Sequence, residues 1–96
     1  MKTFKVHTAN GQFLGNSTLF NGKKIENNHD LSLMIKAHWC KVNSVKSFKQ
    51  WADELNQDED FEGNFTEDDA IDNLCSTYIL NISGKYVDLY KFMKEN

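Results

Sequence analysis

Carboxylates are concentrated in one segment of this sequence, NQDEDFEGNFTEDDA, which runs from Asn56 to Ala70. Seven of its fifteen residues are acidic and none is basic. Proteins use carboxylates at this density to bind calcium, to keep a surface solvated, or to present a row of negative charge to a basic partner. The spacing of the carboxylates decides which of these uses the segment fits.

The spacing over residues 58–69 resembles the calcium-binding loop of EF-hand proteins. Asp58, Asp60 and Glu62 alternate as the first three side-chain ligands of such a loop do, and Gly63 stands at its tight turn. Asp69 takes the place of the closing bidentate glutamate, so a shorter side chain has to reach the same ion. A calcium-binding helix-loop-helix protein is therefore one alternative.

The same carboxylates form a row if the residues after Thr66 are helical. Asp68, Asp69 and Asp72 then fall within a sector of roughly 100°, on the side opposite Ala70 and Leu74. Three charges over the four steps from Asp68 to Asp72 give on average one charge per roughly 2 to 3 Å of axis, which is comparable to one charge per about 1.7 Å on duplex DNA. The sequence predicts a partner-binding acidic surface made of ten carboxylates: Asp53, Glu54, Asp58, Glu59, Asp60, Glu62, Glu67, Asp68, Asp69 and Asp72.

Histidine and cysteine offer no comparable pattern. Cys40 as a nucleophile and His38 as a base lie two residues apart on a predicted helix, which separates them by about 200° around the axis. His38, Cys40 and Cys75 lack the paired spacing of a zinc site, and no motif of a serine hydrolase, a phosphate-binding loop or a zinc protease occurs. We therefore predict a binding protein that is not an enzyme and uses no metal or cofactor.

The lysines lie outside the acidic segment. Residues 1–50 contain eight lysines and two acidic residues, residues 51–83 contain ten acidic residues and no lysine, and the whole chain has a net charge of -3. With 96 residues, 40% of them hydrophobic, the chain fits a single domain over residues 1–96. It has no long apolar run, no pattern of a secretory signal and only two cysteines, which favours a cytoplasmic protein that does not bind a membrane.

Strands are predicted at the start of the chain. Residues 3–8 alternate between apolar and polar side chains, and Asn10-Gly11 is typical of a two-residue type I′ turn. The return strand would cover residues 12–20, and a second turn at Asn21-Gly22 would lead to a short third strand at residues 23–25. The chain is expected to open as a β-meander.

Three helices are predicted between these strands and a closing hairpin. Asp30 would cap a first helix that ends at Val42, and Ser44 would cap a second that ends near Leu55. Thr66 would begin the third with a capping box in which Asp69 replaces the usual glutamate. Residues 76–83 and 85–92 would form the closing hairpin, so the order is β-β(-β)-α-α-α-β-β. This is an α+β domain in which a small antiparallel sheet from the N- and C-terminal strands packs against three helices.

Lysines on the first two predicted helices raise a second alternative, a small helix-turn-helix-like nucleic-acid-binding regulator. It would use Lys36, Lys41, Lys46 and Lys49. The turn between the helices lacks the usual glycine, and the chain contains no arginine, which makes the commonest specific contact to guanine. Lys49 is also four residues before Asp53, which is the spacing of an ordinary surface ion pair on a helix.

A short α+β chain without catalytic motifs, with an acidic patch over residues 53–72 interleaved with Trp51, Phe61 and Phe65, resembles the small phage-encoded DNA-mimic inhibitors, especially anti-CRISPR proteins. The resemblance implies a protein of the host cytoplasm that occupies the lysine- and arginine-lined channel of a CRISPR-Cas complex, with a type I surveillance complex as the first candidate. It implies a protein partner and no direct binding of nucleic acid. Phe61 and Phe65 would anchor the loop or, as we expect for Phe65, close the core beneath it. The lysine-rich first half departs from the most uniformly acidic mimics and leaves open a contact between that half and the partner.

Overall fold

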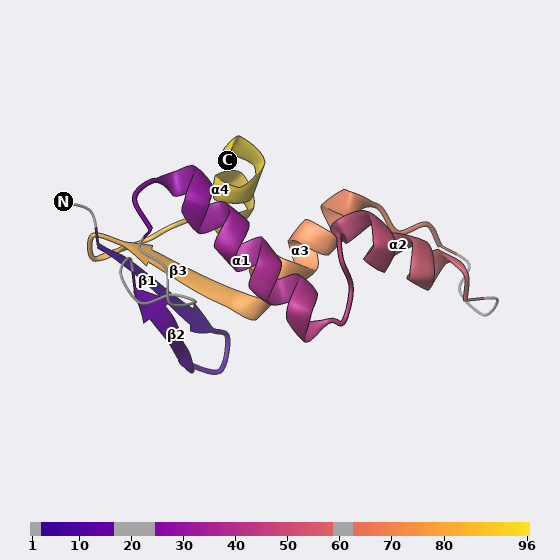
Figure 1. Cartoon of the computed structure of the whole chain (residues 1–96), viewed down its shortest axis with the longest axis horizontal. Coiled ribbons are helices and arrows are strands. Elements are labelled where there is room, and N and C mark those ends of the chain that lie inside the picture. The colour runs from indigo at the N-terminus through magenta and orange to yellow at the C-terminus, as the bar shows by residue number, and fades with distance from the viewer. Residues whose placement is uncertain (1–2, 17–24, 59–62) are drawn as a thin grey trace.

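The computed structural model describes residues 3–16, 25–58 and 63–96. Along the chain the elements are β1 (Phe4–Thr8), β2 (Phe13–Asn16), α1 (Asn28–Val42), α2 (Phe48–Asn56), α3 (Glu67–Thr77), β3 (Tyr78–Ile82), β4 (Lys85–Tyr86) and α4 (Leu89–Glu95). The predicted α+β class, with a small antiparallel sheet and helices, is confirmed. The molecule is elongated, 48 × 25 × 23 Å, and Figure 1 shows the sheet near one end and α2 near the other.

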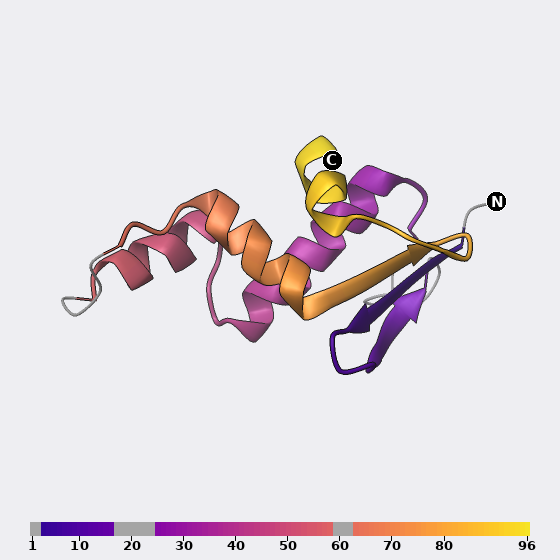
Figure 2. The same ribbon diagram turned by 180° about the vertical axis from the view of Figure 1, so that it is seen from behind.

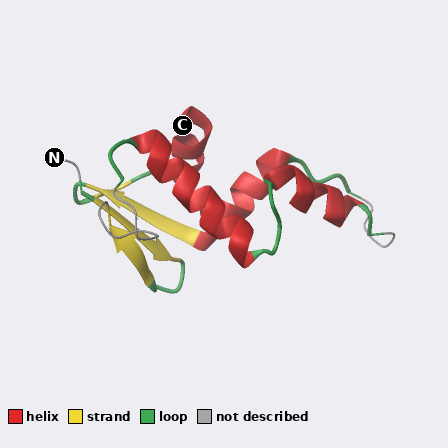
Figure 3. Ribbon diagram, in the orientation of Figure 1, coloured by secondary structure: helices red, strands yellow, loops and turns green. Residues whose placement is uncertain are grey.

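The sheet joins the two ends of the chain, as predicted. Its strand order is β2-β1-β3-β4 and every neighbouring pair is antiparallel. The central pair sets the register, with Phe4 opposite Ile82 and Thr8 opposite Tyr78. Because side chains alternate along a strand, Phe4, Val6 and Leu80 point to one face and are buried there. Figure 3 shows the helices gathered on one side of this small sheet.

The type I′ turn lies at a different place from the predicted one. The Gly11 N–H donates to the Thr8 carbonyl at 2.9 Å, so Ala9 and Asn10 are the central residues of the first turn and Gly11 follows with φ +91°. A turn followed by a left-handed glycine is a common three-residue hairpin. The two-residue hairpin instead uses Ser83 and Gly84, which both have positive φ between the paired residues Ile82 and Lys85.

The predicted third strand falls almost entirely outside the described residues. The turn at Asn21-Gly22 and all of residues 17–24 belong to the part of the chain that is not described. Ile25, the last residue of the expected strand, is buried in the core but is not in a strand. The return strand is described for Phe13–Asn16 only.

Helix α1 begins earlier than predicted. The side chain of Asn27 caps it by accepting from the Asp30 N–H at 2.9 Å, and Asn27 in turn donates to the Asp30 carboxylate at 3.1 Å. Asp30 therefore lies inside the first turn, where its charge suits the positive end of the helix. The helix ends at Val42, as predicted, and this side chain is 63% exposed because the chain turns away there.

Ser44 ends α1 instead of starting α2. Its φ is +57°, its N–H donates to the Lys41 carbonyl at 3.2 Å, and the Val45 N–H donates to the Cys40 carbonyl at 3.0 Å. This pair of bonds is the Schellman motif, in which glycine normally takes the left-handed position. The cap of α2 is Ser47, whose side chain accepts from the Gln50 N–H.

The C-terminal residues form a helix and not the predicted second strand of a long hairpin. Strand β4 contains only Lys85 and Tyr86, and Asp88 then caps α4. Leu89, Phe92 and Met93 are buried, and their spacing of three and four residues is that of a helix face. This spacing explains why residues 89–95 coil onto the core instead of extending the sheet.

The core lies between the sheet and the helices. Leu31, Ile35 and Trp39 of α1 and Leu74 of α3 are fully buried there with the inward side chains of β1 and β3. Helix α2 packs against α3 and buries only Ala52 completely. Figure 2 shows α2 and the start of α3 extending together away from the sheet. We call residues 48–58 and 63–77 the acidic arm.

Candidate functional site

The acidic arm carries the described part of the predicted partner-binding surface. Seven of its carboxylates lie in the described residues: Asp53, Glu54, Asp58, Glu67, Asp68, Asp69 and Asp72. Six of them are exposed and Asp69 is half-buried. The other three predicted residues, Glu59, Asp60 and Glu62, lie outside the described residues together with Phe61.

A chain of aromatic side chains connects the arm to the core. Trp39 of α1 makes edge-to-face contacts with Phe48, at 5.1 Å between ring centroids, and with Trp51, at 5.7 Å. Trp51 contacts Phe65 in the same way at 5.4 Å, so the rings continue from the core into the arm. The indole N–H of Trp39 also donates to Asn73 of α3 at 3.1 Å. One buried tryptophan therefore touches both helices of the arm.

Asn56 holds the two ends of the arm's loop together. Its side-chain amide donates to the Phe65 carbonyl at 2.9 Å, and its side-chain oxygen accepts from the Phe65 N–H at 2.7 Å. Sequence reasoning missed this residue, because an asparagine at the end of a helix has many uses and its partner is nine residues away. The clamp fixes where α3 begins relative to the end of α2.

Asp69 is engaged at the start of its own helix. Its carboxylate accepts from the Thr66 N–H at 2.8 Å, and the Thr66 hydroxyl accepts from the Asp69 N–H at 3.3 Å. The predicted capping box with aspartate in place of glutamate is therefore confirmed. The Asp69 carboxylate is therefore bound to Thr66 and does not project outward with Asp68 and Asp72. Its role is to stabilise the start of the helix that carries them.

Two further carboxylates of the arm form ion pairs within the chain. Asp68 accepts from Lys94 of α4 at 2.6 Å, and Asp53 accepts from Lys49 at 2.7 Å, which is the pair that the sequence predicted. The hydrogen bond to its aspartate raises the pKa of each lysine above its usual value. Both pairs are solvent-exposed, so they add little to stability and can be exchanged for other partners.

The remaining charges of the arm are less engaged. Glu54 accepts a hydrogen bond from Gln50 at 3.0 Å, which leaves its charge unpaired by a cation. Within the described residues, Glu67 and Asp72 make no salt bridge. Lys49 is the only basic residue from position 48 to position 77 of the sequence. The arm is thus a strongly negative projection. Glu54, Glu67 and Asp72 are its exposed carboxylates that form no ion pair within the described residues.

Two of the calcium ligands that the EF-hand alternative requires are described, Asp58 and Asp69. The Asp69 carboxylate is turned toward Thr66, where it accepts both the N–H and the hydroxyl. Asp60 and Glu62 lie outside the described residues. Among the residues that the structure describes, no group of three histidine, cysteine, aspartate or glutamate side chains is placed to hold a metal ion.

The lysines of the helix-turn-helix alternative are spread over the junction between α1 and α2. Lys41, Lys46 and Lys49 are exposed and Lys36 is half-buried. Lys49 is paired with Asp53, so the exposed surface of α2 carries both signs of charge. The turn has no glycine, and Ser44 takes the left-handed conformation that a glycine normally adopts there. The second helix of the motif belongs to the acidic arm, which disfavours contact with a phosphate backbone.

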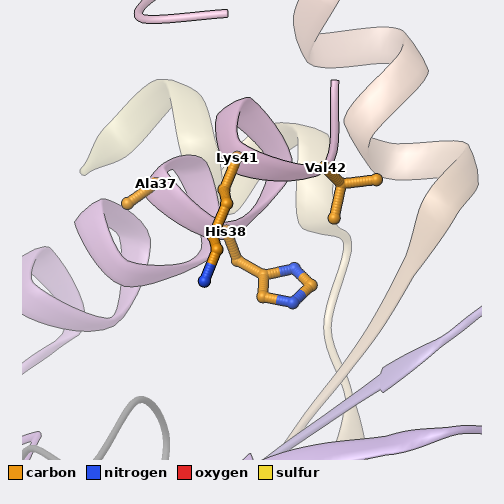
Figure 4. A pocket seen from close by; sticks show the side chains of 4 residues that line it. All are labelled: Ala37, His38, Lys41 and Val42. Carbon is orange, nitrogen blue, oxygen red and sulfur yellow. The ribbon is translucent and has the colours of Figure 1, made fainter. Parts of the chain in front are cut away.

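His38 lies at an open pocket of about 430 Å³ near the end of α1, lined by Ala37, His38, Lys41 and Val42 (Figure 4). Its Nδ1 lies 2.6 Å from the Tyr78 hydroxyl, and burial, followed by the charge of Lys41, lowers the pKa of the imidazole. Burial raises the pKa of the Cys40 thiol as well. The partner of His38 is therefore a tyrosine, and Cys40 stays protonated at neutral pH.

Cys75 of α3 is also a free, half-buried thiol. Burial, with the charges of Asp72 and Asp88, raises its pKa to about 11. Among the helices that the structure describes, none has the length and apolar character needed to cross a membrane.

Comparison of the chain with protein families, with curated proteins and with solved structures finds no match. The interpretation of the site therefore depends on its own geometry.

Proposed function

We propose that the chain is an anti-CRISPR-type inhibitor whose acidic arm mimics DNA and blocks target DNA binding by a CRISPR-Cas surveillance complex in the host cytoplasm. The observation that carries the proposal is that α2 and the start of α3 extend together away from the sheet, with a single lysine among the residues of the acidic arm. A basic channel that holds a nucleic acid accepts a negative projection of similar width and charge spacing. The proposal makes the partner a protein and requires no catalysis.

The dimensions of the arm support this mechanism. Helix α2 has 9 residues and α3 has 11, which gives lengths of about 13 and 16 Å at 1.5 Å per residue.

Clustered carboxylates attract lysine and arginine over long range and speed association at low salt. Arginines of the partner would replace Lys49 and Lys94 on Asp53 and Asp68, because arginine makes the stronger, bidentate bond to a carboxylate.

The structure separates the carboxylates into two groups for a test. Asp69 belongs to the capping box, so changing it disturbs α3. Glu54, Glu67 and Asp72 are exposed and make no ion pair within the described residues, so changing them alters charge with little effect on packing. The variant with Glu54→Gln, Glu67→Gln and Asp72→Asn is therefore the informative one. Glu95→Gln, in the last helix, is a control for Asp72→Asn because both remove one exposed charge.

The test measures how much the purified chain lowers binding of fluorescent target DNA to a type I surveillance complex. We expect the wild-type chain to inhibit, the inhibition to weaken from 50 to 200 mM salt, and the triple variant to require at least about tenfold more protein. Glu95→Gln should inhibit as the wild type does. Equal inhibition by the triple variant would refute the acidic arm as the binding surface, and retardation of duplex DNA by the chain alone would refute mimicry.

A further inference from the structure

The face of the sheet that points away from the helices is the second exposed surface of the molecule. Strand alternation places Lys5 and His7 of β1, and Ile79 and Asn81 of β3, on this outward face. Phe4, Val6 and Leu80 are buried on the other face. The outward face therefore has a defined set of side chains at the centre of the sheet.

Aromatic side chains extend the outward face on both edges of the sheet. Phe13 of β2 lies opposite His7, their ring centroids are 5.2 Å apart, and Phe13 is 51% exposed. Tyr86 of β4 lies opposite Asn81 and is 81% exposed. The face thus carries one row of Phe13, His7 and Ile79 and a second row of Lys5, Asn81 and Tyr86.

The charge of this face is opposite to that of the arm. None of the four strands contains an aspartate or glutamate, and β1 contributes Lys5 to the outward face. The two rows lie two residues apart along the strands, which is about 6.6 to 6.8 Å. Exposed rings, amides and lysines without carboxylates are the groups that bind unpaired bases and their phosphates.

We propose that the outward face of the sheet binds single-stranded nucleic acid. Bases stack on Phe13, His7 and Tyr86, and Lys5 contacts a phosphate. A duplex is not accepted, because its bases are already stacked on one another and are not free to lie on the rings. This inference does not depend on the proposed role of the acidic arm.

The test uses fluorescein-labelled dT12 and U12 in anisotropy titrations at 50 and 200 mM salt. We expect binding that weakens with salt, and a loss of about fivefold or more in affinity for Phe13→Ala and for Tyr86→Ala, because stacking on an aromatic side chain strengthens binding by at least that factor. Tyr90→Ala is the matched control: Tyr90 is 38% exposed on α4, on the helical side, and its removal should leave binding unchanged.

Several outcomes would overturn the proposal. These are no binding of either oligonucleotide at 50 mM salt, an equal loss for Tyr90→Ala, or a dimer in light scattering that Phe13→Ala dissociates, which would make the face a contact between copies of the chain. Thermal melts of Phe13→Ala and Tyr86→Ala verify folding, since both side chains are exposed. The arm variant with Glu54→Gln, Glu67→Gln and Asp72→Asn should keep its oligonucleotide binding. That result separates this proposal from inhibition by the arm.

Discussion

The sheet-bearing core and the acidic arm are held together in different ways. The core encloses Leu31, Ile35 and Trp39 without exposure to solvent. In the arm, α2 buries only Ala52 completely and otherwise uses half-buried rings at its base. Clustered carboxylates repel one another and destabilise a compact structure. The difference shows that the core supplies most of the stability, which lets the arm carry a charge density that it could not maintain alone.

Replacing Trp39 tests most directly whether the core supplies most of the stability. Trp39→Ala removes a fully buried ring that contacts both helices of the arm, and we expect it to lower the free energy of unfolding by about 3 to 5 kcal/mol. Urea unfolding followed by far-UV circular dichroism measures the loss. This is a large part of the stability of a small domain.

Trp51→Ala is the matched variant on the arm side. Because Trp51 is half-buried, we expect a smaller loss, with faster amide hydrogen exchange in α2 and unchanged exchange in β1 and β3. If Trp51→Ala unfolds the sheet at the same urea concentration as Trp39→Ala does, arm and core form one cooperative unit and the comparison fails.

The capping box offers a test confined to the arm. Thr66→Ala removes the hydroxyl that accepts from the Asp69 N–H, and we expect a loss of about 1 kcal/mol, seen as a lower melting temperature and faster exchange at the start of α3. Thr66→Ser keeps the hydroxyl and should behave as the wild type. A similar loss for both variants would show that the threonine methyl group, and not the cap, stabilises this end of the helix.

Ser44, at the junction of core and arm, should respond in the opposite direction. A left-handed conformation costs a non-glycine residue roughly 1 to 2 kcal/mol. Glycine avoids this cost, but it loses more conformational entropy on folding, which offsets part of the stabilisation. We therefore expect Ser44→Gly to raise the free energy of unfolding by about 0.5 to 1 kcal/mol in urea titrations. Ser44→Ala keeps the strain and should not stabilise. A gain with alanine would assign the effect to the lost hydroxyl.

The smallest expected effect is the dependence on pH through His38 in the core. Its pKa is lowered in the folded chain, so between that pKa and about 6.5 the unfolded state binds more protons. Stability from this group is thus full above pH 6.5 and declines as the pH falls. We expect the melting temperature to drop less from pH 7.5 to 5.5 in His38→Gln than in the wild type. His29→Gln accounts for the general effect of losing one histidine, and an identical drop in all three proteins would contradict the prediction.

Hydrophobic spacing was sufficient to predict α1, α3 and the central strands, because their buried residues recur with the period of a helix or a strand. The prediction failed for α4, which was interpreted as a strand although residues 85–92 do not alternate strictly and Asp88 before Leu89 and Phe92 was a visible helix start. The left-handed Ser44 was missed because glycine is the usual signal for that conformation.

The sequence was sufficient to predict which carboxylates make up the acidic site, but only one of its two ion pairs. Lys49 with Asp53 follows from helical spacing. Asp68 with Lys94 joins residues that are 26 positions apart, and it requires α4, which the sequence reading did not place. Tertiary contacts of this kind depend on how elements pack, which no local pattern encodes.

The aromatic chain at the base of the arm gives the molecule a built-in optical reporter. The chain has two tryptophans, one in the core and one in the arm, with ring centroids 5.7 Å apart and planes inclined at 63°. Indole transitions at this separation couple as excitons, and the sign and size of the resulting pair of circular dichroism bands depend on the angle between the rings. A partner that bends or straightens the arm would therefore change this signal without any label on either protein.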